Sequence, residues 1–195
     1  MHLPSWFAAP LAAASLIVSA GAWAQAAPPA AKLVPAQSQV SFVGVEQGVK
    51  LKGEFKKFDV QLALDPKQPQ TGKVAITIDL ASVTLPDAET SAELLKPEWF
   101  GAKKFPQATF QSTSIKGVGA GKLEVAGKLT IKGTARDVVV PVTLAQAGPT
   151  TTATGGFAIK RLAFKIGDGD WADTSMVADE VQVQFKFAFT GVPPL

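Results

Sequence analysis

The chain has 195 residues and a net charge of +3, and it contains no cysteine, no tyrosine and a single histidine, His2. This composition excludes disulfides, thiolate metal sites and the Ser-His or Cys-His pairs that most often perform nucleophilic catalysis. The basic residues are scattered singly or in pairs among 16 acidic ones. Because they form no basic stripe with interleaved aromatic residues, we expect no nucleic-acid partner.

The N-terminal residues have the pattern of a secretory signal peptide. Residues 7–20 are apolar but too short a run for a comfortable membrane-spanning helix, and Ala22, Trp23 and Ala24 form an A-x-A cleavage pattern. An uncleaved N-terminal anchor is the alternative. The predicted divisions are residues 1–24 (signal peptide), 25–32 (flexible lead-in), 33–190 (barrel domain) and 191–195 (frayed tail).

Between these ends, apolar and polar residues alternate with the period of a half-buried β-strand. The pattern is clearest in residues 180–189, where every second side chain is valine or phenylalanine. It recurs in residues 39–42, 73–80, 122–131, 137–144 and 155–160. Helical periodicity is nearly absent. We therefore predict an all-β fold, an eight-stranded antiparallel barrel with its strands joined mainly in up-and-down order.

Two positions predict irregular strands. The apolar phase changes from odd to even residue numbers near Lys56 and Lys57, so one face stays apolar only if the strand bends or bulges there. Pro141 lies within a strand pattern but has no backbone N–H to donate. We expect a local gap or bulge in the sheet at this proline.

A single segment favours a helix. Thr90 and Glu93 have the spacing of a capping box, and Pro97 follows closely enough to end the helix after one or two turns. This short helix lies between the third and fourth predicted strands. It leads directly into an aromatic segment, residues 99–110, which we expect to reach the mouth of the barrel.

The order of several motifs resembles the YceI-like family of secreted bacterial proteins. The resemblance runs from Leu33 to Phe189 and depends on an aromatic pair followed by aromatic-Pro-x-x-x-Phe, with Gly-x-Leu-Thr-x-x-Gly downstream. The segments that carry it are SQVSF (38–42), GEFKKFDVQL (53–62), IDLASV (78–83), LLKPEWFGAKKFPQATF (94–110), GKLTIKGTARDVVVPV (127–142) and FAIKRLAFKIG (157–167). The resemblance implies an extended lipocalin-like barrel that binds polyisoprenoid or similar long-chain lipids.

The function implied by this resemblance is that of a periplasmic binding protein. It would sequester or carry a long-chain isoprenoid lipid in an apolar barrel cavity, with an isoprenoid quinone or a prenyl phosphate as the ligand, no resident cofactor, and a monomer or homodimer as the working form. The residues expected to bind the ligand are Phe42, Leu51, Phe55, Ile76, Leu94, Leu95, Trp99, Phe100, Phe105, Phe110, Leu129, Phe185 and Phe187. An eight-stranded barrel can also be filled by its own side chains, and periodicity does not separate the two.

Two departures from the family pattern bear on partners. Glu46 stands where many members carry a histidine near the end of the first strand. The acidic segment 166–180 resembles a subgroup that occurs with membrane cytochromes of the b561 type. The alternative function is therefore a ligand-free interaction module that docks a membrane redox protein.

The acidic segment and its neighbouring arginine carry further predictions. Asp168, Asp170 and Asp173 allow a calcium loop, but their spacing favours a turn whose carboxylates accept hydrogen bonds from nearby backbone N–H groups. Arg161 is expected to pair with a carboxylate at the barrel rim, with a lipid headgroup contact as the alternative. Since most acids fall on outward strand positions or in turns, we predict no enzyme, no catalytic residues and no metal site.

Overall fold

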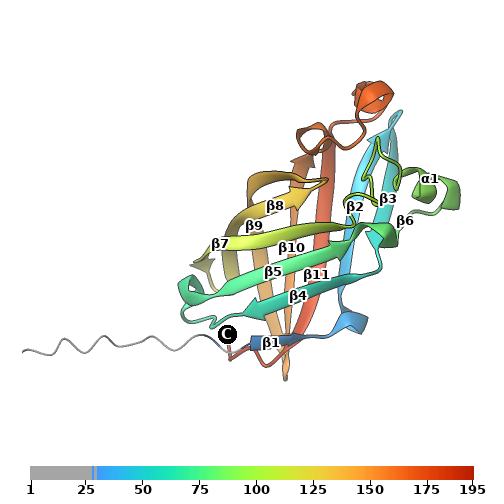
Figure 1. Cartoon of the computed structure of the whole chain (residues 1–195). Helices are drawn as coiled ribbons and strands as arrows, with labels where there is room; N and C mark the ends of the chain where they lie inside the picture. Colours follow the sequence, from blue (N-terminus) through green and yellow to red (C-terminus); the bar gives the residue numbers. More distant parts are fainter. Residues whose placement is uncertain (1–27, 29) are drawn as a thin grey trace, which may run out of the picture.

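The computed structural model describes residue 28 and residues 30–195, so the predicted signal peptide lies outside the described residues. The described strands belong to one sheet that curls into a barrel (Figure 1). Their bounds are β1 (Ala30–Leu33), β2 (Gln39–Glu46), β3 (Val49–Phe55), β4 (Phe58–Ala63), β5 (Lys73–Asp79), β6 (Val83–Thr84), β7 (Gln107–Gly119), β8 (Lys122–Ile131), β9 (Thr134–Ala147), β10 (Thr150–Lys160) and β11 (Glu180–Thr190).

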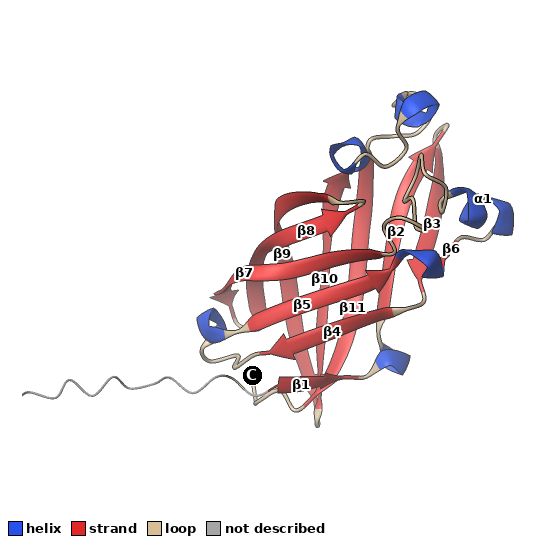
Figure 2. Cartoon of the chain, in the orientation of Figure 1, coloured by secondary structure: helices blue, strands red, loops and turns tan. Residues whose placement is uncertain are grey.

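The helical segments are short and lie at the ends of strands, not across the barrel interior (Figure 2). They are the α-helix α1 (Ala88–Glu93) and the 3-10 helices η1 (Pro35–Gln37), η2 (Pro69–Thr71), η3 (Leu80–Ser82), η4 (Arg161–Phe164) and η5 (Gly169–Ala172). None of the helices in the described part of the chain is long and apolar enough to cross a membrane.

The four-residue strand β1 closes the barrel. Strand β1 pairs with β11 at Lys32 and Thr190, and it pairs with β4 at Ala31 and Leu62, so it bridges the two ends of the strand order. Strand β2 continues β1 after η1, β4 continues β3 after the bend, and β6 continues β5 after η3, so each of these three pairs acts as one interrupted strand. The result is a closed eight-stranded antiparallel barrel with a single short α-helix between its third and fourth strands, as predicted.

The predicted irregularities are both present. Lys56 and Lys57 separate β3 from β4, and this bend keeps Leu51 and Phe55 on the same side of the wall as Val60. Pro141 pairs with Glu124 of β8, but the ladder between β9 and β10 ends one residue away. From Thr134 to Pro141, β9 therefore has no ladder partner in β10, because the proline cannot donate the next bond.

The core follows the alternation seen in the sequence. In β8, the side chains of Leu123, Val125, Leu129 and Ile131 are all buried, while the intervening charged residues point outward. Burying one such aliphatic side chain contributes about 1.5–3 kcal/mol. The alternating face of each strand therefore supplies the wall of the barrel interior.

The start of the helix differs from the prediction. Helix α1 begins at Ala88, and Asp87 is its N-cap: the Asp87 carboxylate accepts hydrogen bonds from the Thr90 N–H (2.6 Å) and the Thr90 hydroxyl (2.8 Å). Thr90 is thus a donor inside the first turn and not the capping residue. The predicted capping box was wrong because the charged carboxylate three residues earlier is available as the stronger acceptor.

Residues at both ends of the domain make contacts that the sequence did not predict. Strand β1 begins at Ala30, within the predicted flexible lead-in, because its backbone completes the sheet between β4 and β11. The predicted frayed tail is held in place: Val192 is buried, and the Gln146 side-chain amide donates to the carbonyl of Val192 (3.4 Å) and accepts from the Leu195 N–H (3.2 Å).

Candidate ligand-binding site

A cavity of about 510 Å³ lies inside the barrel. Its wall is built from the inward side chains of β2 to β5 and β7 to β11, together with residues of α1 and the segment after it. This volume falls within the ~300–1,000 Å³ of sites that hold small organic ligands. The barrel interior is therefore lined and not completely filled.

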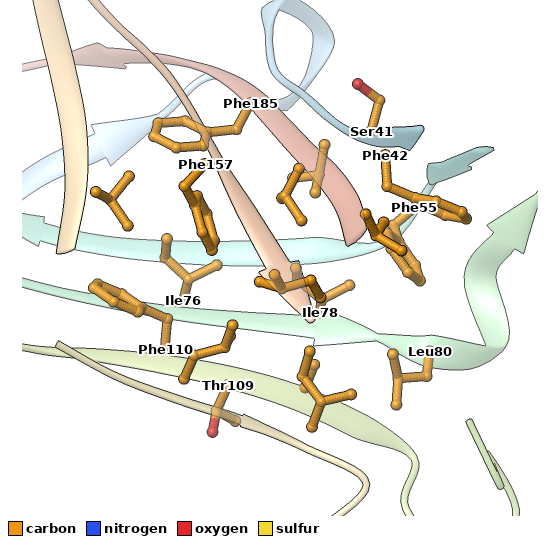
Figure 3. A pocket seen from close by; sticks show the side chains of 18 of the residues that line it. Ser41, Phe42, Phe55, Ile76, Ile78, Leu80, Thr109, Phe110, Phe157 and Phe185 are labelled. Atoms are coloured by element: carbon orange, nitrogen blue, oxygen red, sulfur yellow. The ribbon is translucent and has the colours of Figure 1, made fainter. Parts of the chain in front are cut away.

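The lining is mainly apolar because most polar side chains of the strands turn outward. In Figure 3, Phe110, Phe157 and Phe185 lie around one part of the cavity, with Ile76 between Phe157 and Phe110. The hydroxyl groups of Ser41 and Thr109 point away from this space (Figure 3). A ligand in this part of the cavity would meet aromatic and aliphatic carbon.

Most of the residues predicted to bind the ligand line this cavity. The eleven that do are Phe42, Leu51, Phe55, Ile76, Leu94, Trp99, Phe100, Phe110, Leu129, Phe185 and Phe187. Leu95 and Phe105 lie outside the lining. The structure places the eleven residues at the cavity wall, whereas ligand binding by them stays a prediction.

Leu95 and Phe105 pack behind the wall for local reasons. Leu95 is half-buried against the core, and its carbonyl accepts the N–H of Ala102 (3.1 Å) in a tight turn after α1. Phe105 packs against Gly133, where an added Cβ would lie 2.9 Å from the ring, and the Lys104 ammonium lies 5.4 Å from its centroid. Both residues therefore support the aromatic segment from outside.

Several lining residues were not identified from the sequence. They include the apolar residues Val60, Leu62, Ile78, Leu85 and Phe157, and the acidic residues Glu46, Glu89 and Glu93. Phe157 was detectable, since it shares the strand phase of Ile159 in residues 155–160. The acidic residues come from the end of β2 and from α1, and strand periodicity carries no signal for a helix placed beside the cavity.

Acidic residues outnumber basic ones in the cavity lining. Among the described lining residues, Glu46, Glu89 and Glu93 are acidic and Arg161 is the cation. Glu93 forms an ion pair with Lys96, and its hydrogen bond is the main reason that the pKa of Lys96 is raised. The local charge beside α1 is therefore mainly negative.

The predicted ion pair between Arg161 and a carboxylate is not present among the described residues. Arg161 is 2% exposed, and its side chain donates five hydrogen bonds to main-chain carbonyls: Nε to Ala178, Nη1 to Ile166 and Gly167, and Nη2 to Trp171 and Val177, at 2.7–3.1 Å. Burial lowers the pKa of the guanidinium, and the nearby Asp179 partly offsets this. The prediction failed because the loop folds around the arginine and supplies five acceptors of its own. We name residues 161–179 the Arg161 loop.

Trp99 joins the aromatic segment to the Arg161 loop. The centroids of the Trp99 and Trp171 rings are 5.3 Å apart. The guanidinium carbon of Arg161 lies 5.9 Å from the centroid of the Trp99 ring. The buried indole N–H of Trp99 has no hydrogen-bond partner among the described residues. Ring contacts therefore hold Trp99 in place at the cavity wall.

Lys132 ties the same two segments together. Its ammonium donates to the carbonyls of Glu98 (3.2 Å) and Lys165 (2.6 Å) and to the carboxylate of Asp168 (3.2 Å). The Glu98 carbonyl also accepts the N–H of Gly167 (2.8 Å). These bonds connect the Arg161 loop to Glu98, the residue just before the aromatic segment.

The acidic residues of the Arg161 loop form turns. The Asp173 carboxylate accepts from the Ser175 hydroxyl (2.7 Å) and backbone N–H (2.8 Å), as predicted, and these bonds lower the pKa of Asp173. Asp168 instead contacts Lys132. Within residues 28 and 30–195, no three acidic side chains gather into a group able to hold a metal ion.

The comparisons with known proteins agree with this architecture. A family model described as YceI-like domain matches residues 32–189. The chain belongs to the YceI-like family. Protein YceI of Salmonella arizonae is 44% identical over 94 residues, which are 48% of this chain and 47% of that protein. A UPF0312 protein of Ectopseudomonas mendocina is 36% identical over 90 residues, 46% and 47% of the two chains. Each match thus spans about half the length of the curated relative.

Solved structures extend the similarity over most of the chain. BcnA of Burkholderia cenocepacia is 46% identical, with a TM-score of 0.79 over 80% of this chain and 99% of its own. A polyisoprenoid binding domain from Saccharophagus degradans has a TM-score of 0.67 at 14% identity, over 84% of this chain and 98% of its own. At that identity the second similarity concerns the fold alone.

Proposed function

We propose that this protein is a periplasmic binding protein that sequesters or carries a long-chain isoprenoid lipid or quinone. The observation that carries the proposal is the cavity of about 510 Å³ with its apolar lining. Membership of the YceI-like family and the similar fold of a polyisoprenoid binding domain support it. The A-x-A pattern before Gln25 supports export.

The size of the cavity sets the scale of the ligand. If a methylene-sized group takes the ~30 Å³ that a water molecule takes in the liquid, about 17 such groups fit. At ~0.8 kcal/mol for each buried group, their transfer from water contributes about 14 kcal/mol before the costs of ordering the chain are subtracted. Three or so isoprene units could therefore supply most of the binding free energy, without any specific polar contact.

The charges beside the cavity favour a neutral headgroup. A prenyl phosphate would meet Glu46 and Glu89, and carboxylates repel phosphate oxygens. The nearest cation in the lining, Arg161, already donates to five carbonyls. A quinone carries no net charge and avoids this repulsion. Of the two headgroups, we therefore propose the quinone.

The alternative of a ligand-free interaction module receives less support. A barrel filled by its own side chains would favour that function, whereas the interior contains the cavity. The proposal assigns no reaction to the protein, since its single histidine is His2 and the chain has no cysteine. A membrane redox protein remains a candidate partner for delivery or release of a quinone.

The test is the lipid content of the purified protein. We expect organic extraction and mass spectrometry to recover an isoprenoid lipid, and the stripped protein to take up a quinone with quenching of Trp99 and Trp171 fluorescence. A protein that yields no lipid and takes up neither a quinone nor a prenyl phosphate would overturn the proposal. Mass spectrometry of the intact protein from a periplasmic extract tests its location. We expect the mass of a chain whose N-terminus is Gln25.

A further inference from the structure

Three aromatic rings of the cavity wall each lie against a glycine of the neighbouring strand. Phe42 of β2 is the register partner of Gly53 in β3, and Phe185 of β11 is the register partner of Gly155 in β10. Phe110 of β7 pairs with Leu129, two residues from the third glycine, Gly127 of β8. All three phenylalanines line the cavity, as Figure 3 shows.

Each ring occupies the place that a side chain on its glycine would take. A Cβ added to Gly53 would lie within 3.0 Å of three Phe42 ring carbons. A Cβ on Gly127 would lie 2.6 Å from Cε2 of Phe110, and one on Gly155 would lie 2.5 Å from Cζ of Phe185. Carbon atoms do not approach this closely, so a side chain at these positions would push the ring toward the lumen.

These glycines are not explained by backbone conformation. None of the three has a positive φ, so an L-residue could adopt the same backbone. Glycine in a strand interior weakens the strand, because it loses more conformational freedom and packs no side chain. What the three positions share is a ring seated on the bare backbone. Their common effect is to keep aromatic rings against the wall and the lumen wide.

We propose that Gly53, Gly127 and Gly155 set the width of the cavity and thereby admit methyl-branched prenyl chains. This inference rests on the proposed function. A prenyl chain carries a methyl branch on every isoprene unit and needs a wider channel than an unbranched alkyl chain with the same number of carbons. A ring displaced from its glycine would narrow the channel and exclude the branched chain first.

Gly53 gives the cleanest test of the three. A Cβ at Gly127 would also lie 2.6 Å from the backbone oxygen of Gln111, and one at Gly155 would lie 2.6 Å from that of Pro141. Alanine at either position would therefore shift the backbone as well as the ring. At Gly53 the three nearest atoms all belong to the Phe42 ring, so Gly53→Ala should displace this ring before it displaces any backbone.

The experiment compares two quinones that share a headgroup and a ten-carbon tail. One tail is two isoprene units and the other is an unbranched decyl chain. Binding is followed by tryptophan quenching and by calorimetry. We expect Gly53→Ala to weaken binding of the prenyl quinone by about tenfold, which is the effect of a misfit of one or two carbon groups. Binding of the decyl quinone should weaken by less than about threefold.

Two further variants separate cavity width from a general loss of structure. Gly117→Ala, in β7 but outside the cavity lining, meets only ordinary contact with Pro69 and should bind both quinones as the parent protein does. The double variant Phe42→Leu/Gly53→Ala removes the ring that would be displaced and should recover the prenyl quinone. Thermal melting of each variant checks that it folds.

If Gly53→Ala does not fold, Phe42→Trp tests the same inference, because a larger ring against Gly53 also narrows the channel. It should weaken binding of the prenyl quinone more than binding of the decyl quinone. Equal losses of affinity for both quinones in the variant that folds would overturn the role of the glycines. If the parent protein binds neither quinone, the proposed function itself fails, and the two failures are thereby distinguished.

Discussion

The Arg161 loop and the cavity wall are built on opposite principles. In the loop, one buried cation is surrounded by main-chain carbonyls, and each bond has a defined direction and length. In the cavity wall, aromatic and aliphatic side chains border empty space and make no directional bond across it. One region is specified by hydrogen bonds and the other by shape.

This difference predicts which changes each region tolerates. A buried polar group costs free energy when it loses a partner, so the loop should respond sharply to any change of its arginine. Apolar surface beside a cavity has room to adjust, so the wall should accept added volume with little loss of stability but with a change in ligand binding. Four experiments test this contrast.

The largest effect is expected at Arg161. Arg161→Met leaves five carbonyls without their donors, three of them in buried hydrogen bonds and two in partly buried ones, and we expect the free energy of unfolding to fall by about 4–5 kcal/mol. The stability of Arg161→Lys should lie between those of the parent protein and Arg161→Met, because an ammonium has three N–H groups for five acceptors. Urea denaturation measures both. Arg136→Met is the matched control: Arg136 is exposed and makes a single hydrogen bond, to Ala163, so a loss comparable to that of Arg161→Met would refute the contrast.

The second effect compares added volume in two places. Ile76→Phe places extra carbon in the cavity, so we expect stability to change by less than ~1 kcal/mol while quinone binding weakens about tenfold. Phe164→Trp adds volume at a position that is 2% exposed and outside the cavity lining, and should cost about 1–3 kcal/mol. Equal losses of stability in the two variants would show that the cavity is not open space.

The third effect concerns charge beside the cavity. Glu46→Gln and Glu89→Gln each remove a negative charge while keeping the shape of the side chain. We expect prenyl phosphate to bind several-fold more tightly to the double variant, with quinone affinity unchanged, and the gain to shrink at high salt. Calorimetry at two salt concentrations measures this. A gain of the same size for the quinone would mean that something other than charge had changed.

The smallest effect is a pH dependence of α1. Hydrogen bonds from the Thr90 N–H and hydroxyl lower the pKa of Asp87 below 3.8. The cap therefore stabilises the fold fully above the unfolded pKa, and that contribution is lost as pH falls through the lower folded pKa. The protection of the Thr90 N–H from hydrogen exchange, taken relative to the intrinsic rate at each pH, should fall in acid. In Asp87→Asn, which keeps an acceptor but does not titrate, this acid-induced loss of protection should disappear.

The fold was largely readable from the sequence. Alternation in residues 122–131 and 180–189 located the strands, the phase change near Lys56 located the bend, and Pro141 located the end of a ladder. Each of these signals is local. The closing strand β1 was missed because four residues rich in alanine carry no alternation, and only their two partner strands define them.

The site was readable only in part. Phe110 and Phe185 were placed at the cavity because their strand phase decides which side they face. The cavity itself was not predictable, since periodicity is the same for a filled barrel and an open one. The partners of Arg161 were also beyond reach, because a loop that wraps a side chain with its own carbonyls leaves no mark in residue type.

The pairing of Lys32 with Thr190 brings the two ends of the domain side by side, with the C-terminus near β1 (Figure 1). A ring of this kind cannot be completed by the first residues to emerge from a ribosome or a translocation channel. It stays an open sheet with two unpaired edges until the last strand arrives, and such edges invite pairing with other chains. Closure should therefore be a late, slow step of folding.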